Sequence, residues 1–288
     1  MNRSRVCLAL VCAAASLLAT NACRGKELRS VDATKFSDEA GEEAAQRMGR
    51  IETEIAALGA QDPWAGDYFC GDGLGVRLLL QVAPNAGFLF EHWGCLGLYD
   101  RNWGEIDERD GALAFTCHFV NEREGPFFHS AYVPAKWGER RYLIAPRQMK
   151  SFCNAVNMGD EPRASGYGDF LLRRNESETP PTGLPELPRE FASMVRDHPL
   201  QASVVAVQVG RFVKTSGVRL RTTVVTLDVG SKDGAWEGME LFVIGQRLIS
   251  KLTISKCQDS HCSAESNFRV DEQLPEIGWK LASRPPDR

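Results

Sequence analysis

The sequence predicts a mainly β protein with few helices, in which an N-terminal helix precedes an antiparallel β meander or barrel domain and a smaller C-terminal β-barrel follows. Two runs of short segments alternate apolar and polar residues, which is the pattern of half-buried strands. Glycine-containing turns separate these segments, and a proline-rich stretch separates the two runs. A chain of 288 residues with 43% hydrophobic content can fill the cores that this plan requires.

Residues 1–22 have the pattern of a cleavable signal peptide. Arg3 and Arg5 form a short positive region before the uncharged run from Val6 to Ala19. This run is too short to span a bilayer, and the small Ala22 suits the position before a signal-peptidase cut. The sequence therefore predicts an exported protein, located in the periplasm or anchored to a membrane as a lipoprotein.

Cys23 stands immediately after Ala22, and the junction resembles a lipobox, where bacterial lipoproteins are cut before a cysteine that receives lipid. Asn21 departs from the small or apolar residue usual at its position. The alternative is ordinary cleavage that leaves Cys23 unmodified. We expect membrane contact only through a lipid on Cys23, since no later stretch is apolar for long enough to span a membrane.

Residues 23–62 combine a polar stretch with an amphipathic helix from Ser37 to Leu58. Ser37 can cap the helix, and Asp38 and Glu39 favour the positive end of its dipole. We expect the helix to dock on the protein's own β domain, although a coiled-coil partner is an alternative. The apolar residues that form its seam are Ala44, Met48, Ile51, Ile55 and Leu58.

Residues 63–174 form the expected antiparallel β domain. Its strands alternate around Val76 to Val82 and, after the turn Pro84 to Gly87, around Phe88 to Phe90. A helix is expected at Pro146 to Asn157, and a last short strand at Phe170 to Leu172. Residues 175–188 then read as a proline-rich linker, and residues 189–288 as a short helix and a small β-barrel.

Cysteine usage fits an oxidising compartment. Six cysteines follow Cys23, and an even number in an exported chain favours disulfides. Cys257 and Cys262 flank a short polar turn and are expected to pair across a hairpin end, although zinc binding by these cysteines and His261 is an alternative. The other four are expected to form disulfides whose pairing stays open: Cys70, Cys95, Cys117 and Cys153.

The aromatic residues of the first domain define a candidate ligand cavity. The domain opens with Gly66-Asp67-Tyr68, and in this feature and its meander it resembles lipocalin-like barrels. The alternative is that the rings fill a small β core. The residues expected to line a cavity for a small apolar ligand are Phe88, Phe90, His92, Trp93 and Trp103.

Two further resemblances concern the C-terminal part and the whole chain. The segments Leu227 to Gly234 and Glu237 to Leu241 resemble small periplasmic β-barrel modules of bacterial cell-shape and flagellar-assembly proteins. This resemblance implies an interaction module that binds a protein partner. Through Gly71 to Gly75 and Gly97 to Asn102, the chain resembles an uncharacterised bacterial exported or lipoprotein family, which implies no activity.

Catalytic motifs are not recognised, and no cofactor site is expected. A three-histidine metal site is opposed by strand parity, since His92 is expected to face inward and His118 outward. A formal charge of −4 without a basic run argues against nucleic acid as a partner. We expect a non-catalytic envelope protein that binds a ligand or another envelope protein, and an enzyme with its site in the aromatic-rich first domain is the alternative.

Overall fold

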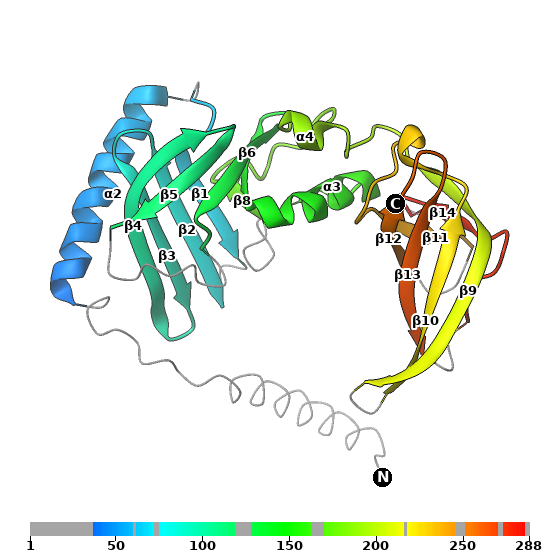
Figure 1. Cartoon of the computed structure of the whole chain (residues 1–288). Coiled ribbons are helices and arrows are strands. Elements are labelled where there is room, and N and C mark those ends of the chain that lie inside the picture. Colours follow the sequence, from blue (N-terminus) through cyan, green and yellow to red (C-terminus); the bar gives the residue numbers. More distant parts are fainter. Residues whose placement is uncertain are drawn as a thin grey trace, which may run out of the picture.

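The computed structural model describes residues 37–59, 62–71, 75–118, 128–162, 170–215, 218–245, 251–269 and 273–285. The predicted signal peptide and Cys23 lie outside the described residues. The predicted fold class is confirmed, because the protein is mainly β and contains two closed antiparallel barrels with few helices (Figure 1). Among the described residues, no helix combines the length and apolar character needed to cross a bilayer.

Barrel 1 is an eight-stranded meander in which each strand pairs with its neighbour in sequence. The last strand returns to the first, where Tyr68 pairs with Arg173 and Phe69 with Leu172, so the sheet has closed on itself. The expected last strand at Phe170 to Leu172 is therefore confirmed. The strands are β1 (Gly66–Gly71), β2 (Val76–Ala83), β3 (Gly87–Gly94), β4 (Gly97–Arg109), β5 (Ala112–Cys117), β6 (Ala131–Trp137), β7 (Arg140–Ile144) and β8 (Phe170–Arg173).

The helix α2 (Asp38–Leu58) covers the outer face of β2, β3 and β4. The hydroxyl of Ser37 accepts a hydrogen bond from the Ala40 amide at 3.1 Å, which caps the helix as expected. Its seam packs on Leu89 and Trp103, so docking on the protein's own β domain is confirmed. The carboxylate of Glu54 also accepts hydrogen bonds from the amides of Asn85 and Ala86, which fixes the β2–β3 turn to the helix.

Barrel 2 has six strands in the order β10-β13-β12-β11-β14-β9. Its core is aliphatic and is lined by Val204, Val225, Leu241, Ile254 and Leu281. The long hairpin of β9 and β10 extends beyond the other strands (Figure 1). The strands are β9 (Gln201–Thr215), β10 (Val218–Leu227), β11 (Glu240–Val243), β12 (Lys251–Cys257), β13 (Cys262–Arg269) and β14 (Lys280–Ala282).

Four short helical elements complete the fold of the described residues. The 3-10 turn η3 (Pro146–Gln148) leads into α3 (Met149–Met158), close to the predicted bounds. The helix α4 (Arg189–Ala192) is shorter than the helix expected over Arg189 to Asp197. The 3-10 turn η4 (Ser231–Asp233) lies in the connection between β10 and β11.

The proline-rich segment 175–188 lies along barrel 1 and is held there by hydrogen bonds. The backbone groups of Lys136 and Glu186 bond to each other in both directions. The indole N–H of Trp137 donates to the Gly183 carbonyl at 2.8 Å, and the buried guanidinium of Arg140 donates to the Ser177 carbonyl at 2.8 Å. The segment has the composition of a linker, but long-range polar contacts order it against β6 and β7.

Candidate functional site

The five residues predicted to line an apolar cavity divide between the two faces of the barrel 1 sheet. Phe88 and Phe90 are fully buried on the inner face, and strand alternation places His92 on the same face. Trp93 lies on the opposite face of β3. Trp103 pairs with Leu89 and packs beneath α2, also on the outer face. These side chains therefore do not surround one common space.

The inner rings contact one another closely in the core of barrel 1. The rings of Phe88 and Phe128 stack with centroids 5.4 Å apart, and Phe115 meets Phe88 edge-on at 4.9 Å. Phe115 also contacts Tyr132 at 5.3 Å. This arrangement matches the alternative in which the rings fill a β core, because edge and stacked contacts at these distances are ordinary core packing.

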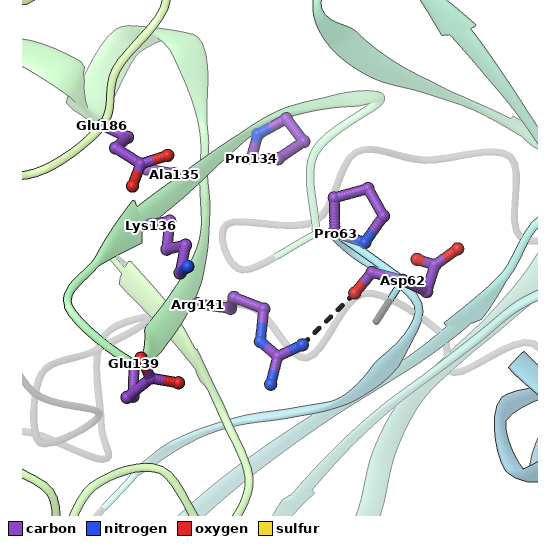
Figure 2. A pocket seen from close by; sticks show the side chains of 8 residues that line it. All are labelled: Asp62, Pro63, Pro134, Ala135, Lys136, Glu139, Arg141 and Glu186. Atoms are coloured by element: carbon purple, nitrogen blue, oxygen red, sulfur yellow. Dashed lines mark hydrogen bonds between the residues drawn. The ribbon is translucent and has the colours of Figure 1, made fainter. Parts of the chain in front are cut away.

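A cavity of about 610 Å³ lies instead at the rim of barrel 1, beside β6 and β7 (Figure 2). Its volume is within the range of small-molecule sites, roughly 300 to 1,000 Å³. Sequence reasoning missed this cavity because its walls come from four separate segments, and no single motif marks them. The lining residues are Asp62, Pro63, Pro134, Ala135, Lys136, Glu139, Arg141 and Glu186.

Most charged side chains of this cavity are acidic. Arg141 is already paired with Glu176, and its Nη1 donates to the Asp62 carbonyl at 3.2 Å (Figure 2). Arg141 therefore acts as a fixed part of the wall. The Asp62 carboxylate accepts from the Trp64 and Ala65 amides, so the remaining charges at the rim are the carboxylates of Glu139 and Glu186 against the single ammonium of Lys136. This balance favours a polar ligand that carries a positive group.

Pro134 limits how a peptide could bind at the same place. Beyond Tyr132, β6 has no pairing to β5 among the described residues, and Lys136 on this edge already bonds to Glu186, which leaves Pro134 at the cavity. An extended peptide could add to such an edge only through backbone hydrogen bonds. Proline has no N–H to donate, and it blunts edge strands. The cavity wall therefore fits a small ligand better than an added strand.

A second feature is the joint between the barrels, which α3 forms. Its apolar face buries Phe152 and Cys153 against barrel 1. Its polar face meets the β10–β11 connection, where the Asn154 amide donates to the Gly238 carbonyl at 2.8 Å and accepts from the Glu240 amide at 3.0 Å. The segments that resemble periplasmic β-barrel modules thus contain the residues that contact α3.

Trp236 completes this joint by packing against the core of barrel 2 and against the cluster between α3 and the outer face of β6 and β7. Its indole N–H donates to the Met194 carbonyl at 3.1 Å. Asn157 lies beside it, donates to the same carbonyl at 2.8 Å and accepts from the Arg196 amide at 2.9 Å. These paired contacts fix the two barrels relative to each other.

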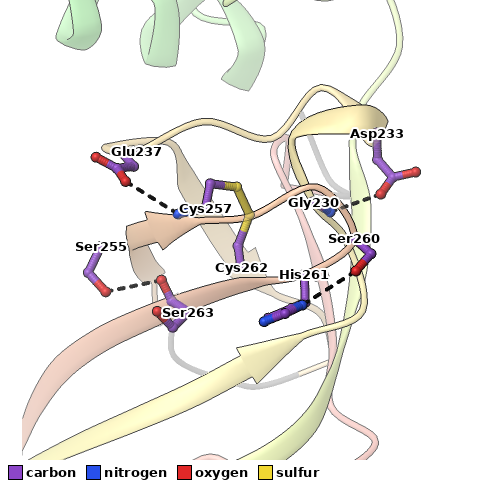
Figure 3. The surroundings of a disulfide bond; sticks show 9 residues. All are labelled: Gly230, Asp233, Glu237, Ser255, Cys257, Ser260, His261, Cys262 and Ser263. Atoms are coloured by element: carbon purple, nitrogen blue, oxygen red, sulfur yellow. Dashed lines mark hydrogen bonds between the residues drawn. A yellow bond between two sulfur atoms is a disulfide. The ribbon is translucent and has the colours of Figure 1, made fainter.

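The disulfide between Cys257 and Cys262 is present at the β12–β13 hairpin end, as predicted (Figure 3). The turn that it closes packs on η4, where the Ser231 amide donates to the Gln258 carbonyl at 2.8 Å. Since both sulfurs are in this bond, the alternative of zinc at this turn is not supported. The disulfide therefore fixes the hairpin end against the β10–β11 connection.

The cysteines of barrel 1 differ from expectation. Cys95 is an exposed free thiol and Cys153 is a buried free thiol, so the structure does not contain the two disulfides expected among the four cysteines. Burial raises the pKa of the Cys153 thiol to about 12. Cys70 lies in the barrel core, and Cys117 packs against that core. The alternation of residues along each strand could not predict that these disulfides are missing. It shows on which face of the sheet a cysteine lies, but not how far apart two strands lie when they are distant in sequence.

The three histidines considered for a metal site are dispersed. His92 is half-buried, with its ring 5.3 Å from that of Tyr99, and burial lowers its pKa although Asp100 partly opposes this. His118 is exposed beside Glu105, whereas His129 is buried against Tyr132. Within the described ranges, no three histidine, cysteine or acidic side chains are grouped so that they could hold a metal ion.

Comparisons with known proteins identify no relative: no family model matches the chain, and no curated protein matches it.

Proposed function

We propose that this protein is an exported, non-catalytic bacterial envelope protein that acts as a binding module, and that its ligand is a small polar molecule carrying an ammonium group. The cavity beside β6 supports this proposal most directly, because its volume suits a small molecule and its rim is mainly acidic. The export part rests on the pattern of residues 1–22.

The packing of barrel 1 explains why binding would use the cavity beside β6 and not the barrel core. Phe88, Phe115 and Phe128 fill the inner face and contact one another. A ligand that entered there would have to displace buried rings, each of which contributes on the order of 3 kcal/mol to the core. A ligand in the cavity beside β6 would displace no buried ring, because several of the lining residues are already exposed. These residues are Pro63, Lys136, Glu139 and Glu186.

Native mass spectrometry of protein purified from its own cell envelope tests the proposal. We expect a bound mass that is retained by the unsubstituted chain and lost from a Glu139→Gln, Glu186→Gln variant, because the rim then loses two of its carboxylates. Glu190→Gln is the matched control, since Glu190 is an exposed carboxylate outside the cavity. A bare mass for the unsubstituted chain, or a bound mass that the double variant keeps, would contradict this function.

A further inference from the structure

The hairpin of β9 and β10 extends past the rest of barrel 2, at the end opposite to α3 (Figure 1). Strand β14 pairs with β9 only from Gln201 to Ser203, and β13 follows β10 only as far as Leu220. Within the described residues, the outer half of β9 therefore pairs with β10 alone. We define the arm as this part of β9, Val205–Thr215, with Val218–Thr223 of β10, of which Leu220–Thr223 also pair with β13.

The arm is rich in cations. Between His198 and Leu227 the sequence contains Arg211, Lys214, Arg219 and Arg221 and no acidic residue, although the whole chain has a formal charge of −4. Arg219 and Arg221 form no ion pair with a described residue. Their guanidinium groups lie on one face of β10, where like charges repel unless an anion lies between or above them.

Apolar side chains on the same face of the arm are also exposed. The Phe212 side chain pairs across the strands with Arg221, and the Arg221 and Arg219 Cζ atoms lie 3.9 Å and 4.9 Å from its ring centroid. Phe212 is 39% exposed, and Val209 on the same strand is 47% exposed. An aromatic ring held between guanidinium groups is amphipathic, with an apolar body and a cationic rim.

We propose that this arm binds the surface of an anionic phospholipid membrane, with Arg219 and Arg221 on the lipid phosphates and Phe212 and Val209 at the level of the headgroups. The charge of the arm is complementary to such a surface, which attracts nearby Lys and Arg side chains. Arginine suits phosphate because its planar guanidinium can donate two parallel hydrogen bonds. The arm projects beyond the other strands of barrel 2 (Figure 1), a shape that fits a soft and extended surface.

This inference goes beyond the proposed function and does not depend on the cavity beside β6. It also differs from the expectation that membrane contact occurs only through a lipid on Cys23. Electrostatic attraction to anionic lipids adds to the binding that buried apolar groups give at a membrane surface. The arm would supply such an attraction whether or not Cys23 is modified.

Vesicle sedimentation of the full chain tests the proposal, with phosphatidylcholine vesicles compared with vesicles that also contain phosphatidylglycerol. The arm variant carries Arg219→Glu and Arg221→Glu. The control variant carries Arg109→Glu and Lys232→Glu, which changes the formal charge equally at side chains that are 70% and 74% exposed and lie outside the arm. Equal circular dichroism spectra and melting temperatures would show that all three chains are folded.

We expect the unsubstituted and control chains to bind phosphatidylglycerol vesicles, and the arm variant to bind them at least about tenfold more weakly. Phe212→Ala should weaken binding several-fold while leaving its salt dependence unchanged, because it removes apolar contact and no charge. Equal binding of the arm and control variants would overturn the proposal. Equal binding of the unsubstituted chain to both kinds of vesicle would also overturn it. The same holds if the arm cross-links only to an acidic protein. None of these outcomes bears on the native mass spectrometry that tests for a ligand in the cavity beside β6.

Discussion

The side chain of Arg173 occupies the space that a side chain on Gly66 would fill. The two residues lie on β8 and β1, the strands that close barrel 1, and Arg173 is the direct partner of Tyr68 in this pairing. A Cβ at position 66 would overlap the Arg173 Nε and lie 3.0 Å from its Cζ. Glycine at the start of β1 therefore allows the arginine to lie across the closure of the barrel.

The first prediction is that Gly66→Ala lowers the free energy of unfolding by about 2 kcal/mol, because the added methyl group forces Arg173 from its position. Chemical denaturation would measure the change. Replacing Arg173 by alanine in the same chain should recover part of the loss, since the methyl group then has room.

Gly49→Ala is the control for this substitution. Gly49 lies in the interior of α2, is exposed and has no atom within 4 Å of a built Cβ. Alanine there should raise stability by about 1 kcal/mol, because it restricts the unfolded chain and favours the helix. If Gly66→Ala and Gly49→Ala lowered the free energy of unfolding by similar amounts, the contact with Arg173 would not be the cause of the loss at position 66.

The second prediction concerns Asn154 at the joint between the barrels. Asn154→Ala should leave the Glu240 amide and the Gly238 carbonyl without their partner, at a cost of about 2 kcal/mol in the free energy of unfolding. Hydrogen exchange of the Glu240 amide should become at least about tenfold faster. Asn154→Asp should retain slower exchange, because its carboxylate still accepts from that amide. Unchanged exchange in the alanine variant would contradict the assigned contact.

The third prediction is that replacing both Cys257 and Cys262 by serine costs about 2 kcal/mol without unfolding barrel 2. The closed loop is short, so the disulfide removes little entropy from the unfolded chain. Denaturation under oxidising conditions would measure the loss. Peptide mapping without reductant gives an independent check, because a crosslink from either residue to Cys95 or Cys153 would refute the pairing.

Local patterns in the sequence were enough to predict several of the strands, the helix α2 and the disulfide. Alternation around Val76 to Val82 and the glycine turn before Phe88 are signals contained within a few residues. The helix was predictable because Ser37 can cap it and its apolar residues repeat at helical spacing. In each case the residues that determine the element are close together in the chain.

The closure of barrel 1, the ordered segment 175–188 and the cavity were beyond such patterns. Closure joins Tyr68 to Arg173, which lie far apart in sequence. The proline-rich segment resembles a linker until Arg140 and Trp137 are seen to donate to its carbonyls. The division of the aromatic residues was partly predictable, since Trp93 must lie opposite His92 on one strand. The position of Trp103 depends on the register between β3 and β4, which the pattern leaves open.

The last prediction is that His92 makes the protein less stable as the pH falls below neutrality. The ring is half-buried on β3, and burial disfavours its charged form, so its pKa is lowered in the folded protein, with Asp100 opposing part of the effect. The unfolded chain keeps the ordinary value of about 6.5. As the pH falls below that value, the unfolded state binds a proton more readily than the folded state does. The contribution to stability is therefore present above pH of about 6.5 and is lost as the pH falls through the folded pKa.

His92→Gln removes this titration, so its free energy of unfolding should fall less than that of the unsubstituted chain between about pH 7 and pH 5. Urea denaturation at several pH values in that interval would measure both curves. His198→Gln is the matched control, because it makes the same substitution at a histidine whose side chain is 87% exposed. If the free energy of unfolding fell equally with pH in the unsubstituted chain and in His92→Gln, burial on β3 would not disfavour the charged form of His92.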